Sequence, residues 1–225
     1  MAVLEGGTST SLAEVGAAAA QALHATAKPI PHGALGHYWT SHRCAIVASQ
    51  AANSRLFEIR NTHATNLMVL THVRVQVVQT AAHTAAIEDS VDMYKATSFS
   101  AVDTTNTVTP VISVMRTAGM AVVGSSIAAV RGVTVAGAAT GMTGGTLTKD
   151  TAPAWQVPIW LLAAVPTGGP TPSNQFEYMP DTGNGEHPWV FAQNEGFIIE
   201  NRVLLGVAAG SSVYIDVGWA EVTAY

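Results

Sequence analysis

Eight histidines are the side chains of this chain best suited to metal binding or to acid–base chemistry. They are His24, His32, His37, His42, His63, His72, His83 and His187. Their spacing matches neither the two-histidine helix of a metalloprotease nor a zinc finger. His37 and His42 are five residues apart and would face opposite sides of a strand, whereas His63 and His72 flank a polar turn across which they could approach. Scattered surface or hydrogen-bonding histidines are therefore favoured over a metal centre.

Carboxylates and serines offer the other routes to catalysis. Glu88, Asp89 and Asp92 cluster in the sequence, and glycoside hydrolysis needs two carboxyl groups within about 5–10 Å of one another. A cluster of this kind at the start of a strand is typical of solvated charge. Ser125 and Ser126 follow a glycine but lack the Gly-x-Ser-x-Gly pattern of a nucleophile elbow. We therefore predict a protein that is not an enzyme and has no cofactor, metal or catalytic residues.

The overall composition limits the classes of partner that the protein is expected to bind. Only 11% of the 225 residues are charged, against about 25% in an average soluble domain. This low charge indicates either a surface that is covered in an assembly or a neutral, alanine-rich protein from a GC-rich genome. The formal net charge is -5 and no run of Lys or Arg occurs, which argues against direct nucleic-acid binding.

Membrane insertion, export and disulfide bonding are not predicted either. The most apolar stretch, residues 155–165, is about half the length that a spanning helix needs. The first residues lack the basic start of a signal peptide. Cys44 is the single cysteine, which excludes an intrachain disulfide and a cysteine-based zinc site, and we expect it to be a small core residue. A protein made and used inside a cell, or assembled there and released, fits these features.

The elements that must position these residues are strands. Val69, Thr71, Val73, Val75 and Val77 alternate with polar residues, which predicts a half-buried strand whose other face carries His72, Arg74 and Gln76. Further strands are expected in the following ranges: 56–60, 90–99, 107–115, 127–135, 155–165, 189–192, 197–205 and 213–219. Residues 194–196 read as the tight turn of a hairpin, and residues 167–181 as a long functional loop. Four tryptophans on or beside these strands are predicted to be core: Trp155, Trp160, Trp189 and Trp219.

About eight to ten strands at short spacing, without βαβ alternation, predict an all-β fold, an antiparallel β-sandwich of jelly-roll type covering residues 36–225. Residues 1–35 differ, because glycines, a Thr/Ser run, alanines and prolines cannot bury much apolar surface. They predict an N-terminal arm that orders against a partner. Residues 11–14 match a helix capping box and residues 17–23 favour helix, so a short helix inside an otherwise extended arm is preferred.

Several stretches of the chain resemble a family of tailed-phage virion proteins. They are LMVLTHVRVQVVQT at 67–80, DMYKATSFSAVD at 92–103, EHPWVFAQNEGFIIEN at 186–201, VYIDVGWAE at 213–221, and the start with Glu5-Gly6-Gly7, Ala13-Glu14-Val15 and the Pro-Ile-Pro step at 29–31. The resemblance touches both ends and the middle, about half of the chain, and its motifs carry no catalytic chemistry. It implies a structural part of a phage particle, assembled in the host cytoplasm.

Among such parts, a low-charge sandwich with an arm is similar to a capsid decoration or cement protein. The resemblance implies that its partners are the major capsid protein, other virion proteins and further copies in a dimer or trimer. A tail, baseplate or fibre component involved in host attachment is the alternative. We predict that the arm binds through Leu4, Leu12, Val15 and Leu23 as apolar anchors, with main-chain pairing to a sheet edge giving affinity.

Overall fold

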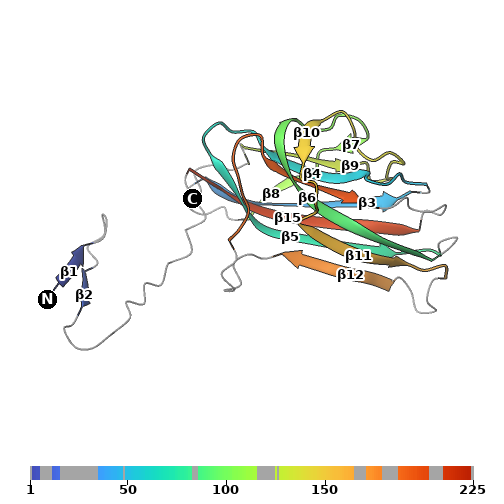
Figure 1. Cartoon of the computed structure of the whole chain (residues 1–225), viewed down its shortest axis with the longest axis horizontal. Helices are drawn as coiled ribbons and strands as arrows, with labels where there is room; N and C mark the ends of the chain where they lie inside the picture. The colour runs from blue at the N-terminus through green and yellow to red at the C-terminus, as the bar shows by residue number, and fades with distance from the viewer. Residues whose placement is uncertain are drawn as a thin grey trace.

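The computed structural model describes residues 2–5, 12–15, 35–47, 49–82, 86–115, 125, 127–164, 171–178, 187–202 and 210–223. Within these ranges every regular element is a β-strand and every strand pair is antiparallel. Two large sheets lie face to face (Figure 1). The predicted all-β antiparallel sandwich is thereby confirmed, whereas the finer jelly-roll assignment stays a prediction.

The first layer, called here the β6 sheet, has seven strands in the order β10-β6-β14-β4-β9-β7, with β11 also paired to β6. Its strands are β4 (Arg55–Asn61), β6 (Ile87–Ala101), β7 (Thr107–Val108), β9 (Ala128–Val133), β10 (Thr146–Lys149), β11 (Trp155–Leu161) and β14 (Gly196–Asn201). The long strand β6 carries β11 along its first half and β10 along its second half. Consequently β11 and β10 follow one another along the same strand of this layer.

The second layer, called here the β5 sheet, has six strands in the order β12-β5-β15-β3-β8, with β13 also paired to β5. Its strands are β3 (Gly36–Ile46), β5 (Leu67–Gln79), β8 (Ile112–Val114), β12 (Thr171–Tyr178), β13 (Val190–Phe191) and β15 (Ser211–Val222). Strand β15 lies between β5 and β3 along its whole length. The closing strand of the chain is therefore the centre of this sheet.

A chain of aromatic rings joins the two sheets through the core. The Trp155 ring on β11 lies 4.5 Å from the rings of both Tyr178 on β12 and Trp189. Phe191 on β13 continues the contact to Phe197 on β14, with centroids 6.2 Å apart. Aromatic rings bury large apolar areas, so these contacts hold the two sheets together.

The alternation predicted for residues 69–77 is correct in its second half and wrong in its first. Val73, Val75 and Val77 face the core, but before them it is Met68 and Leu70 that do so. A register shift opposite Gly218 and Trp219 leaves one extra residue on β5. Such a β-bulge inverts the faces of every residue on one side of it, and its position depends on the partner strand.

Three other local predictions are also wrong. Residues 189–192 and 197–201 are not a hairpin, because β13 pairs with β5 in one sheet while β14 pairs with β4 and β6 in the other. The predicted loop at 167–181 contains the strand β12 (Thr171–Tyr178), which pairs, among the described strands, with β5 alone and has a register shift after Pro172. The helix start at residues 11–14 is replaced by a strand, β2 (Leu12–Val15), whereas residues 17–23 lie outside the described ranges.

The buried His42 ring lies directly against Gly132 of the facing sheet. A Cβ atom at Gly132 would lie 2.6 Å from His42 Nε2, which is closer than real Cβ contacts. The same Nε2 is buried and has no hydrogen-bond partner among the described residues, and burial lowers the pKa of His42. The close approach of β9 and β3 therefore depends on a glycine at position 132.

Gly132→Ala is expected to lower the free energy of unfolding by about 1–3 kcal/mol, because the methyl group overpacks the core against the His42 ring. His42→Ala alone also destabilises by leaving a cavity. The double variant is expected to lose less stability than the sum of the two single losses. Without the His42 ring the new methyl group meets no clash, and the methyl group fills part of the cavity that the ring leaves. Urea denaturation of the four proteins measures this coupling. A Gly132→Ala protein as stable as the wild type would contradict the predicted contact.

Candidate functional site

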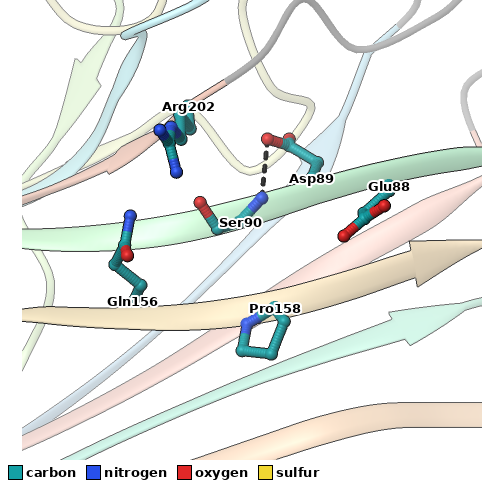
Figure 2. A pocket seen from close by; sticks show the side chains of 6 residues that line it. All are labelled: Glu88, Asp89, Ser90, Gln156, Pro158 and Arg202. Carbon is teal, nitrogen blue, oxygen red and sulfur yellow. Dashed lines mark hydrogen bonds between the residues drawn. The ribbon is translucent and has the colours of Figure 1, made fainter.

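Two residues of the acidic cluster noted in the sequence, Glu88 and Asp89, line a pocket on the outer face of the β6 sheet (Figure 2). Glu88 is exposed there, whereas Asp89 is 4% and Asp92 1% exposed. Asp89 accepts a hydrogen bond from the Ser90 backbone N–H at 2.7 Å, and Asp92 accepts one from the Ser90 hydroxyl at 2.6 Å. The interpretation as solvated charge is therefore wrong for the two aspartates, which are built into the sheet.

A second carboxylate pair, Glu58 on β4 and Asp103, comes together only in the fold. Both side chains are fully buried, and the Asp103 backbone N–H donates to Glu58 Oε1 at 2.6 Å. Burial, reinforced by the neighbouring Asp103 carboxylate, raises the pKa of Glu58 to about 7. Arg55 Nη1 lies 3.0 Å from Asp103 Oδ2. Such a pair cannot touch a substrate, and it acts on stability instead.

The described histidines occupy separate places. On β3, His37 faces outwards and bonds the Thr71 hydroxyl at 3.0 Å, while His42 faces the core, so the predicted opposite faces are confirmed. His63 Nδ1 accepts from the Asn66 backbone N–H at 3.0 Å, and His72 bonds Glu177, so this pair does not meet. Among the described residues no group of three or more His, Cys, Asp or Glu side chains is placed to hold a metal ion.

The remaining nucleophile candidates are structural where they are described. The Ser125 hydroxyl donates to the buried carboxylate of Glu221, which also accepts from the Trp219 indole. Ser126 lies outside the described residues. Cys44 is fully buried, and burial raises the pKa of its thiol to about 12, which makes it inert as a nucleophile.

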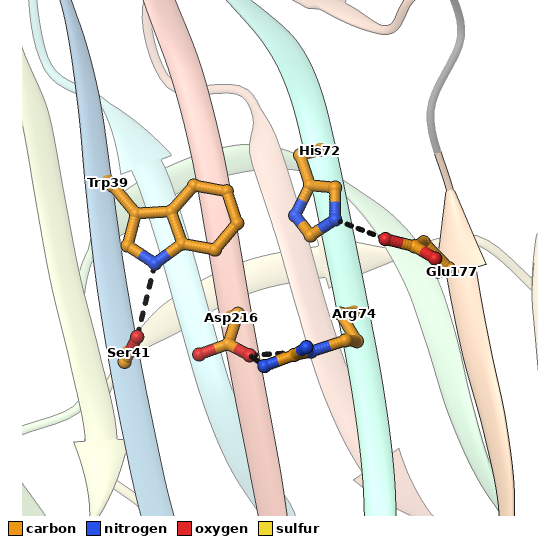
Figure 3. Close-up of polar contacts among 6 residues, drawn as sticks. All are labelled: Trp39, Ser41, His72, Arg74, Glu177 and Asp216. Atoms are coloured by element: carbon orange, nitrogen blue, oxygen red, sulfur yellow. Dashed lines mark hydrogen bonds and ion pairs between the residues drawn. The ribbon is translucent and has the colours of Figure 1, made fainter. Parts of the chain in front are cut away.

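A row of polar side chains crosses four adjacent strands on the outer face of the β5 sheet (Figure 3). The Trp39 ring stacks on the His72 ring with centroids 4.6 Å apart. Gly218 lies between them in the sheet, and a Cβ there would lie 2.9 Å from a Trp39 ring carbon, so the glycine permits the stacking. On the same face Arg74 Nε donates to Asp216 at 2.8 Å. The charges of this row pair with one another, as in a surface that faces water or a neutral partner.

The predicted arm anchors fall on a separate hairpin. Leu4 lies on β1 (Ala2–Glu5), while Leu12 and Val15 lie on β2 (Leu12–Val15). The two strands form a sheet of their own in which Leu4 pairs with Ala13. Leu23 lies outside the described residues. The structure therefore brings three of the four anchors into one two-stranded unit.

Comparisons with known proteins do not place the chain in a family. No family model, no curated protein and no solved structure matches it. Within the described ranges, no helix is long and apolar enough to cross a membrane. The functional argument therefore depends on the arrangement of the chain itself.

Proposed function

We propose that this chain is a non-enzymatic structural component of a tailed-phage virion, a decoration protein that binds and stabilises the head shell. The observation that carries the proposal is the β1–β2 hairpin, which pairs with no other described strand. A hairpin of two strands is at best marginally stable in water. Each of its strands keeps one edge for main-chain hydrogen bonds to a neighbouring sheet, so a partner strand would complete it.

The sandwich also offers an edge to neighbours. Strand β8 ends the strand order of the β5 sheet and pairs, among described strands, with β3 alone. Val111 and Met115 on either side of it are 79% and 53% exposed. An exposed edge strand with apolar flanks is a template for pairing with another chain. The partners that fit are the major capsid protein, other virion proteins and further copies in a dimer or trimer.

Composition and resemblance support the same assignment. A surface with few charges resists association poorly, and the chain has 11% charged residues. The stretches at 67–80, 92–103 and 186–201 resemble tailed-phage virion proteins. Assembly in the host cytoplasm and a final location in the virion follow from this proposal.

Deleting residues 1–30 is expected to abolish binding to phage heads while the sandwich stays folded. Co-sedimentation with heads assembled from the cognate capsid protein measures binding, and circular dichroism with urea denaturation measures folding. A second variant keeps the full length of the chain and changes Leu4, Leu12, Val15 and Leu23 to serine. It is expected to bind heads about tenfold or more weakly, which corresponds to about 1.4 kcal/mol.

A truncated chain that decorates heads as well as the full-length chain would exclude the arm as the anchor. The copy number in purified virions separates the two virion roles. Hundreds of copies would favour head decoration, whereas a few to a few dozen would favour a tail, baseplate or fibre part.

A further inference from the structure

The pocket on the outer face of the β6 sheet combines donors and acceptors from three segments (Figure 2). Its volume is about 570 Å³, which lies within the range of small-molecule sites. The lining residues are Glu88, Asp89, Ser90, Gln156, Pro158 and Arg202. They come from β6, from β11 and from the residue that follows β14.

An exposed tryptophan stands beside this pocket. Trp160 is predicted from sequence to be core, but 57% of it is exposed. The antiparallel register places Trp160 directly opposite Glu88, and Pro158 opposite Ser90. Exposure alternates along β11, so Gln156, Pro158 and Trp160 lie on one face of the sheet. The exposed indole therefore lies on the same face as the lining residues Gln156 and Pro158 and next to Glu88, although Trp160 is not itself a lining residue.

The buried Asp92 bonds two of the polar side chains that line the pocket. The Ser90 hydroxyl donates to Asp92 Oδ1 at 2.6 Å, and Gln156 Nε2 lies 3.4 Å from Asp92 Oδ2. The backbone N–H of Arg202 donates to the Ser90 carbonyl at 3.0 Å, which fixes the root of the arginine side chain. The exposed Arg202 forms no ion pair with a described residue. Its guanidinium is thus available to a ligand.

The charged residues that line the pocket indicate which kind of ligand it can bind. Glu88, which is exposed, opposes an anion such as phosphate, and Arg202 opposes a bare cation. A neutral or weakly charged molecule with many hydroxyl groups satisfies both kinds of group, because each hydroxyl donates and accepts. A ring with one apolar face also fits flat against an exposed indole. These are the properties of a sugar ring.

We propose that this pocket, together with the neighbouring Trp160, binds a saccharide. The site goes beyond the proposed function, since it lies on the sandwich and uses none of the arm residues. It would allow an assembled particle to hold a glycan on its surface while the arm remains engaged.

The test uses the full-length chain on an array of immobilised neutral, amino and uronic-acid oligosaccharides, followed by titration with the strongest binder. Binding is expected to change the tryptophan fluorescence. Trp160→Ala is expected to weaken binding about tenfold or more. Trp160→Phe keeps an aromatic surface and is expected to retain most of the affinity. Glu88→Gln is expected to weaken binding less than Trp160→Ala.

Tyr214→Ala, which removes an exposed ring from the outer face of the β5 sheet, is the matched control and is expected to bind as the wild type does. Absence of binding to every saccharide of the array would overturn the proposal, as would equal affinity of Trp160→Ala and wild type. A loss of oligomeric mass in Trp160→Ala, measured by light scattering, would overturn it by assigning the tryptophan to a subunit contact. These outcomes are independent of the head-binding assay.

Discussion

Replacing Arg55 with methionine is expected to lower the free energy of unfolding by about 3–5 kcal/mol at about pH 7.5, because it leaves two buried carboxylates without their cation. Arg55 Nη1 lies 3.0 Å from Asp103 Oδ2 and 3.7 Å from Glu58 Oε2, and both acidic side chains are fully buried. In the described part of the chain no other Lys or Arg forms an ion pair with either of them. Methionine keeps most of the length and the apolar body of the side chain, so lost packing contributes little.

Urea denaturation measures this effect. The loss in Arg55→Met is expected to be smaller at about pH 5, since one of the two carboxyl groups then takes up a proton. Arg43→Met is the matched control: Arg43 is exposed, lies over the Tyr214 ring at 5.7 Å and donates to the Ser212 hydroxyl. Its replacement is expected to change stability by about 1 kcal/mol or less. An equally small effect at Arg55 would show that the buried acids do not need it.

Glu58 is expected to make the wild-type protein less stable as the pH rises from about 4.5 to about 7. Burial is the main cause of the raised pKa of this group, and the Asp103 carboxylate adds to it. A raised carboxyl pKa means that the folded chain holds the proton more tightly than the unfolded chain. The stabilisation is therefore complete below the unfolded pKa and is lost as the pH rises through the folded pKa. At 1.36 kcal/mol per pKa unit, the change amounts to about 3 kcal/mol.

Glu58→Gln removes the ionisation with little change of shape, and the fall of stability with pH is expected to become flatter. Denaturation midpoints at several pH values between about 4.5 and about 7.5 measure the slope. Burial also raises the pKa of Glu200 and lowers that of His42. Both groups remain in the variant, so the difference between the two slopes reports Glu58 alone. The exposed Glu88→Gln variant should keep the wild-type slope, and an unchanged slope in Glu58→Gln would contradict the raised pKa.

Part of the candidate site was predictable from spacing along single strands. The alternation around His72 and Arg74 correctly placed both on an exposed face, and the cluster at Glu88 and Asp89 does reach a pocket. The Glu58–Asp103 pair could not be predicted, because its members are 45 positions apart in the sequence. They meet only where β4 contacts the segment that follows β6. No pattern among residues that are neighbours in the sequence indicates such a contact.

The burial of Trp160 could not be predicted correctly from the sequence either. It lies in the most apolar stretch of the chain, which predicts a core position, yet its neighbours Val157, Ile159 and Leu161 take the core face. Strand alternation then assigns Trp160 to the outside. The sequence pattern indicated the strand, but the phase of the strand depended on its register with β6.

By itself, the sequence determined the class of fold, because period-two patterns and turn residues act within a few neighbours. It also determined the low charge and the distinct composition of the first 35 residues. Tertiary structure alone decided the assignment of β13 and β14 to different sheets, the bulge in β5 and the residues that gather around Arg55 and beside Trp160. The physical reason is that strand partners are chosen by contacts between distant segments, and a shift of one residue exchanges the buried and exposed faces.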